Sequence, residues 1–153
     1  MSLYAAIDET WPPAAWHTAG PFTLREGQGG GKRVSAATCD RPVTDGEIAA
    51  AEDAMAALGQ AALFMVRGDQ PGLDDQLARR GYAIVDPVVL LAGPVDVAAG
   101  DGPPPVTAFP VWPPMAIQAE LWAEAGIGPA RLAVMQRVAG PKITVLGRLD
   151  DRP

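Results

Sequence analysis

The feature that most constrains the fold is a set of landmarks that occurs twice in the same order. Trp-Pro-Pro occupies residues 11–13 and 112–114, and Gly-Pro occupies residues 20–21 and 128–129. Each Gly-Pro is followed by a strand-like run, a glycine-containing turn that ends in lysine, and a second strand-like run. Internal repeats indicate two copies of one supersecondary unit. The sequence therefore predicts two related parts.

The first copy contains a glycine-rich stretch between two strand-like runs. Phe22 and Leu24 alternate with polar residues, the period of a half-buried strand, and Val34 to Thr38 reads as a second short strand. The glycines of residues 27–31 favour a β-hairpin with a long tip. A P-loop requires G-x-x-x-x-G-K-S/T, but this spacing is one residue short and Arg33 stands where the hydroxyl belongs. The hairpin is therefore favoured over a phosphate site.

The second copy predicts another hairpin, from residue 131 to residue 149. Its strands would be Arg131 to Val138 and Lys142 to Leu149. An isolated two-stranded hairpin is marginally stable, and an exposed apolar edge invites pairing. We expect this hairpin to pack either on the sheet of the first part or on the same hairpin of a second molecule, and a homodimer is favoured.

Local signals place the other elements. Residues 2–18 read as one or two short helices, with Trp11 to Pro13 at a helix start. Thr44 is a good N-cap, and Glu47 completes a capping box. The remaining predicted elements are a helix over Asp45–Leu58, a buried strand over Ala61–Val66, a helix over Leu73–Arg80, a strand over Tyr82–Leu91 and a helix over Met115–Gly126.

Composition narrows the classes of function. The net charge of −6 argues against nucleic acid or an anionic membrane surface as a partner. Cys39 is the only cysteine and His17 the only histidine, so no intrachain disulfide is possible and no metal site is expected. We interpret His17 as a solvent-facing helix residue. Without a visible signal peptide or a long apolar run, the chain is expected to be a soluble cytoplasmic protein.

A composition change marks the predicted domain boundary. Residues 93–109 are rich in Pro, Gly and Asp and predict a linker, the most mobile internal segment. The sequence thus predicts a first lobe over residues 1–92 and an incomplete second lobe over residues 110–153.

The order of elements through residue 91 resembles the GNAT family of N-acetyltransferases. The closest similarity is Leu73 to Leu91, where a short helix ends in Leu-Ala-Arg-Arg-Gly-Tyr and passes into a long strand. The resemblance implies an α+β fold, a GNAT-like mixed sheet with flanking helices, followed by the helix and hairpin that begin a second GNAT-like lobe. Two-lobed members of the family place a degenerate lobe before an active one.

The family binds acetyl-CoA at an R/Q-x-x-G-x-G/A turn between a strand and a helix, where N–H groups hold the pyrophosphate. The matching place here is Cys39 to Gly46, which has one glycine, a proline and two aspartates. No residue carries over as a cofactor ligand or as a catalytic residue. The resemblance therefore implies acetyl-CoA for a longer native protein and none for this segment, which alone is expected to be inactive.

The acceptor of such an enzyme would be a small-molecule or peptide amine. Glu120 and Glu124 lie at i and i+4 of the predicted second-lobe helix, with Trp122 between them, and could bind a cationic acceptor. A solvated acidic face beside a core tryptophan explains the same residues and is favoured. Two functions stay open: the front part of a two-lobed acetyltransferase, and a non-catalytic binding or dimerisation module.

Overall fold

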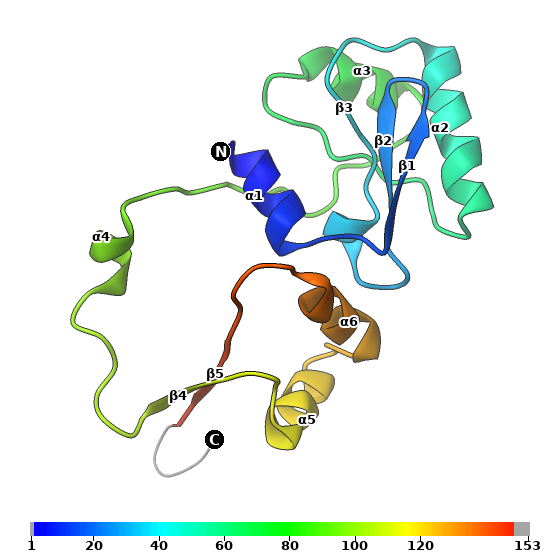
Figure 1. Ribbon diagram of the computed structural model, residues 1–153. Helices are drawn as coiled ribbons and strands as arrows, with labels where there is room; N and C mark the ends of the chain where they lie inside the picture. The colour runs from blue at the N-terminus through cyan, green and yellow to red at the C-terminus, as the bar shows by residue number, and fades with distance from the viewer. Residues whose placement is uncertain (1, 149–153) are drawn as a thin grey trace.

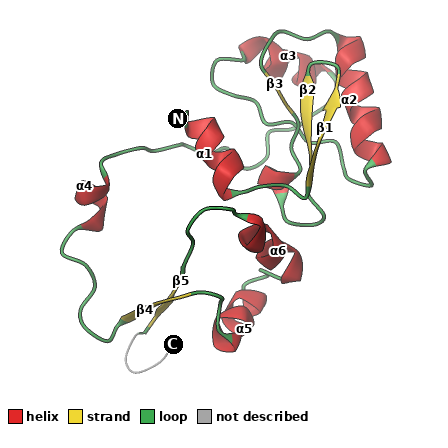
Figure 2. Cartoon of the chain, in the orientation of Figure 1, coloured by secondary structure: helices red, strands yellow, loops and turns green. Residues whose placement is uncertain are grey.

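The computed structural model describes residues 2–148 and has an α+β fold (Figures 1 and 2). Its helices are α1 (Leu3–Thr10), α2 (Asp45–Ala57), α3 (Pro71–Arg79), α4 (Val95–Ala99), α5 (Ala116–Glu124) and α6 (Pro129–Arg137), with a 3₁₀ turn η1 at Lys32–Val34. Its strands are β1 (Ala15–Ala19), β2 (Phe22–Glu26), β3 (Thr38–Cys39), β4 (Ala108–Val111) and β5 (Thr144–Gly147).

A three-stranded antiparallel sheet organises the first half of the chain. β1 and β2 form a tight hairpin around Gly20-Pro21, with Ala19 opposite Phe22, and β3 lies on the other side of β2. The predicted strand over Phe22–Glu26 is confirmed. The helix predicted from Trp11 is wrong, because residues 15–19 alternate between half-buried and exposed side chains as a strand does. His17 therefore lies on a strand and not on a helix.

The helix over Asp45–Ala57 is confirmed together with its cap. Thr44 and Glu47 form both bonds of the capping box, and Ile48, Ala51 and Met55 are buried. Helix α3 is also confirmed, with Leu73 and Leu77 buried. The core joins these helices to the sheet: Phe22, Leu24, Ala37, Cys39, Val43, Ile48, Ala51, Met55, Leu73 and Leu77 form one cluster.

Residues 61–66 are extended but do not form the predicted strand. One parallel bridge joins Ala37 to Phe64, with Ala37 N–H donating to Leu63 C=O over 2.8 Å and Met65 N–H to Ala37 C=O over 2.9 Å. Pairing stops there because glutamine side chains take the neighbouring carbonyls. Gln60 Nε2 donates to Ser35 C=O, and Gln70 Nε2 donates to Cys39 C=O.

The strand predicted over Tyr82–Leu91 is wrong. Tyr82 still contacts the core, with its ring 5.4 Å from that of Phe64, but the segment beyond is exposed and Val89 is 82% accessible. No strand pairs with this segment among residues 2–148. The positive φ of Asp86 ahead of Pro87 also interrupts an extended run.

The predicted second hairpin is wrong. Arg131–Val138 is not a strand, since Pro129–Arg137 forms helix α6, with Gly128 as N-cap and Pro129 in the first turn, where proline is favourable. Val34 of the first copy likewise lies in η1, and only Thr38 of that predicted strand pairs with β2. Strand β5 pairs with β4 instead of a neighbouring run, and Leu149 lies outside the described residues.

The repeated landmarks therefore occupy different structures. Gly20-Pro21 forms a hairpin turn, whereas Gly128-Pro129 starts a helix. The second part consists of α5, α6 and the β4–β5 pair (Figure 1). The two copies therefore do not repeat one supersecondary unit in the described residues.

Candidate functional site

A cavity of about 450 Å³ lies between the loop before α2 and helix α3. The loop contributes Asp40 to Val43, and the segment from Asp69 to Arg79 forms the facing wall. This loop includes residues of the Cys39–Gly46 segment, which the resemblance to the GNAT family sets at the position of that family's cofactor turn. Cavities with converging polar groups are the usual places for small-molecule binding, so it is the first candidate site.

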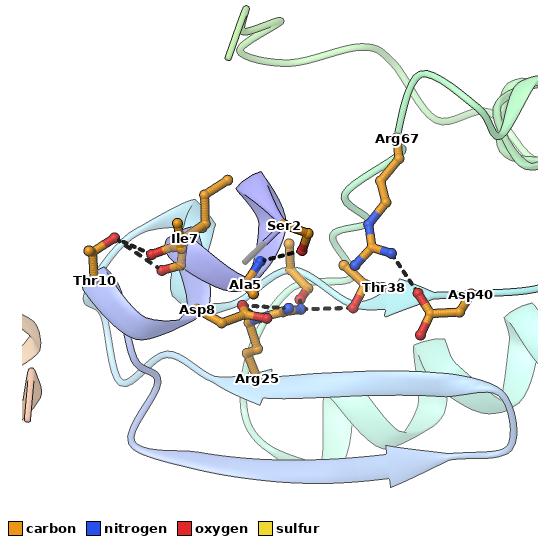
Figure 3. A network of polar contacts seen from close by, with 11 residues as sticks. Ser2, Ala5, Ile7, Asp8, Thr10, Arg25, Thr38, Asp40 and Arg67 are labelled. Atoms are coloured by element: carbon orange, nitrogen blue, oxygen red, sulfur yellow. Dashed lines mark hydrogen bonds and ion pairs between the residues drawn. The ribbon is translucent and has the colours of Figure 1, made fainter. Parts of the chain in front are cut away.

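Side chains from the α3 region hold this loop in place. Gln70 Nε2 donates to Cys39 C=O over 2.7 Å, and Gln76 Nε2 donates to Val43 C=O over 2.9 Å. Arg67 Nη1 pairs with Asp40 Oδ1 at 2.5 Å (Figure 3). The Arg67 guanidinium also lies 4.4 Å from the ring centre of Tyr4. Long-range contacts therefore hold the loop in addition to its local bonds.

The helix that follows the loop already carries an internal anion at its N-terminus. Glu47 Oε2 accepts from Thr44 N–H at 2.8 Å, and Arg41 Nη2 donates to Glu47 Oε1 at 2.6 Å. The hydrogen bond from Arg41, followed by that from Thr44, lowers the pKa of Glu47 to about 2. The Glu47 side chain is therefore ionised at neutral pH and occupies the favourable electrostatic position at the helix start.

Carboxylates dominate the charge around the cavity. Asp40, Asp69 and Asp75 line it, and Arg41 is already paired with Glu47. Arg79 is the other basic side chain in the lining. A phosphate placed here would meet an excess of negative charge, and a cationic group would be accepted more readily.

A second polar network lies beside this site and fixes helix α1 to the sheet (Figure 3). Arg25 is 2% exposed and donates to Asp8 Oδ1, from Nη2 at 2.8 Å and from Nε at 3.2 Å. Its Nη1 donates to Ala36 C=O and to Thr38 Oγ1. Every bond of this guanidinium goes to the protein, so the network is structural.

The structure places the predicted acceptor residues on α5. Glu120 and Glu124 are exposed, and Trp122 is half-buried. None of the three lines the cavity at α3 or the smaller one between Trp112 and Gln136. Their role in binding an acceptor stays a prediction.

The sequence analysis did not identify three residues that hold this loop: Gln70, Gln76 and Arg67. No local pattern marks them, because their partners lie about 30 residues away in the chain.

The described residues contain no cluster of three or more His, Cys, Asp or Glu side chains that could hold a metal ion. Among residues 2–148, no helix combines the length and the apolar character that crossing a membrane requires. No protein-family model, curated protein or solved structure matches this chain.

Proposed function

We propose that this chain is the front part of a GNAT-like N-acetyltransferase, which transfers acetyl from acetyl-CoA to a small-molecule or peptide amine. In this proposal residues 1–92 are a degenerate first lobe, residues 93–109 a linker, and residues from 110 onward the start of a second lobe. The protein is proposed to act in the cytoplasm. The predicted hairpin over residues 131–149 does not form, since Pro129–Arg137 is a helix, so it does not support this division.

The single observation that carries the proposal is the parallel bridge between Ala37 and Phe64. It places one residue of the 61–66 segment parallel to the chain just before β3, which is the strand direction that a GNAT-like mixed sheet would require, although no fourth strand joins this sheet in the described residues. Helix α2 packs on β1 and β2 before the chain returns through residues 61–66 and enters α3. The observed order is helix, three strands, helix, extended segment and helix, which supports a lobe of this class only as far as α3. The long strand over Tyr82–Leu91, where the resemblance is closest, does not form in the described residues.

The loop from Cys39 to Gly46 does not fit the pyrophosphate of acetyl-CoA. Asp40 and the ionised Glu47 lie where a phosphate would need basic or neutral partners, and Arg41 is already paired. We therefore assign no catalytic or cofactor-binding residue to this segment. Its proposed contribution is to the acceptor side, through Glu120, Trp122 and Glu124.

Isothermal titration of the 153-residue chain with acetyl-CoA tests the degenerate lobe. We expect no binding in the micromolar range. Micromolar affinity, together with NMR shifts of the Cys39–Gly46 amides on addition of acetyl-CoA, would overturn this assignment. The chain encoded by the whole reading frame is then assayed for CoA release with a panel of amines. Activity that falls in Glu120→Gln and Glu124→Gln variants, with KM raised more than kcat is lowered, supports the acceptor role.

A non-catalytic dimerisation module is the second candidate. It is favoured by the run of exposed apolar side chains on residues 84–97, which a partner would cover. Static light scattering of the chain decides its oligomeric state, and we propose a homodimer. A monomer at all concentrations, together with a reading frame that contains R/Q-x-x-G-x-G/A, would exclude this candidate in favour of the enzyme.

A further inference from the structure

Two arginines from distant parts of the chain meet at Trp11. The guanidinium carbon of Arg33 lies 5.3 Å from the centre of the Trp11 ring, and that of Arg131 lies 4.9 Å from it. Arg33 belongs to η1, directly after the glycine-rich loop, and Arg131 belongs to α6, which lies beside that loop (Figure 1). The pair therefore exists only because the two halves of the chain are in contact.

Neither guanidinium forms an ion pair within residues 2–148. The carboxylates of the ion pairs in the described chain bind other cations. The arginines with carboxylate partners include Arg25, Arg41, Arg67 and Arg80. Each guanidinium carries a positive charge near the same ring, and an anion bound there would be attracted by both.

The glycine-rich loop adds backbone donors at the same place. A Cβ on Gly31 would lie 2.5 Å from Arg131 Nη2, so the guanidinium lies directly against the backbone of Gly31. The N–H groups of Gly29 and Gly31 make no hydrogen bond to other described residues. Both glycines have positive φ, and the N–H of Gly30 between them donates to Gly27 C=O. The N–H groups of Gly29 and Gly31 are therefore the donors that this part of the loop offers to an anion.

We propose that Trp11, Arg33, Arg131 and the N–H groups of Gly29 and Gly31 form a binding site for a phosphate group. The planar guanidinium fork matches phosphate oxygens, and the backbone N–H groups complete the set of donors. This arrangement differs from a P-loop, because one of its two cations, Arg131, comes from a distant helix. The inference does not rest on the acetyltransferase proposal.

The site has a thermodynamic consequence for the whole chain. A phosphate that binds Arg33 and Arg131 together favours the arrangement in which α6 lies on the loop, since a ligand stabilises the state that it binds. Phosphate is therefore expected to raise the melting temperature, whereas chloride at equal ionic strength is not.

NMR titration of the ¹⁵N-labelled chain with inorganic phosphate, at ionic strength held constant with chloride, tests the site. We expect saturable shifts of the Gly29 and Gly31 amides and of the Arg33 and Arg131 Nε–H signals. AMP and pyrophosphate form two further arms: tighter binding of either one points to a phosphate ester or anhydride as the natural ligand, and equal binding points to free phosphate. Saturation in none of the three titrations overturns the proposal.

Arg33→Met and Arg131→Met remove the charges but keep an apolar chain against Trp11. Each is expected to weaken phosphate binding about tenfold, the effect of one charge-assisted hydrogen bond. Arg80→Met is the control for a lost positive charge, because Arg80 is exposed, pairs with Glu52 and lines neither this site nor the cavity at α3; it is expected to leave phosphate binding unchanged. Arg131→Lys keeps the charge and is expected to retain part of the affinity. Unchanged binding in a folded Arg131→Met variant would refute the site.

Discussion

At Gly30 the glycine-rich loop approaches α6 so closely that a methyl group does not fit. A Cβ there would lie 2.4 Å from Val134 Cγ2 and 3.0 Å from Gly27 O. Gly30→Ala is expected to destabilise the chain by about 1–3 kcal/mol through overpacking. Urea unfolding measures this, and adding Val134→Ala should recover part of the loss.

Gly46 provides the matched control for that substitution. It lies in the first turn of α2, and nothing lies within 4 Å of a Cβ built there. Gly46→Ala should stabilise by roughly 0.5 kcal/mol, because alanine lowers the entropy of the unfolded chain. If both alanine variants change stability alike, the close packing of Gly30 on Val134 is refuted.

The carboxylate of Glu47 makes the cap of α2 sensitive to acid. Its folded pKa is about 2 against an ordinary value of 4.5, mainly because Arg41 donates to it. A lowered folded pKa gives stability that is present above the unfolded pKa and lost as the pH falls through the folded pKa. We therefore expect the cap to weaken from about pH 4.5 down to about pH 2.

NMR titration of the Glu47 carboxyl checks this behaviour. In an Arg41→Met variant the pKa of Glu47 should move up toward 4.5, while the backbone bond from Thr44 keeps it below that value. An unchanged Glu47 pKa in this variant would contradict the assigned cause.

Helix α1 is held by polar contacts and not by a buried apolar face. None of its residues is buried, and Asp8 binds the buried Arg25. Asp8→Asn is expected to destabilise the chain by about 1–3 kcal/mol, because it leaves a buried guanidinium without its charged partner. Glu9→Gln, the same change on the exposed neighbouring residue, should have little effect in thermal unfolding. Equal effects would show that α1 docks by other means.

The elements predicted correctly are those whose signals are local. Thr44, Glu47 and the apolar spacing of α2 lie within one stretch, and so do the leucines of α3. The strand predicted over Tyr82–Leu91 failed because β-branched residues form a strand only beside a partner strand. The strand predicted over residues 131–138 also failed. That prediction depended on the repeat hypothesis, whereas Gly128-Pro129 is a local signal for the start of a helix.

For the candidate site too, the sequence predicted the local features and missed those that depend on the fold. The acidic character of the Asp40–Gly46 loop could be read from the sequence, and so could its mismatch with a cofactor turn. The hydrogen bonds from Gln70 and Gln76 to this loop could not be predicted, because only the fold brings their side-chain amides to the loop carbonyls. The contact of Arg33 and Arg131 at Trp11 likewise depends on the docking of α6.

At the scale of the whole molecule, a long exposed segment separates the two parts of the chain. Residues 83–106 are exposed throughout the positions whose burial is described, and α4 is their single helix (Figure 2). Limited proteolysis should therefore cut first within residues 93–109, as the sequence predicts. Thermolysin is the suitable protease, because this stretch contains valines but no lysine or arginine. A first cut inside Asp45–Leu58 would mean that the boundary is misplaced.

The contact between Gly30 and Val134 also sets the order of events when the chain folds. It closes a loop of about 100 residues, which costs more entropy than the two-residue turn between β1 and β2. Contacts of such long sequence separation form slowly. Stopped-flow refolding should therefore show the first sheet in an early phase and the docking of α6 in a later one, with Val134→Ala slowing or abolishing only the later phase.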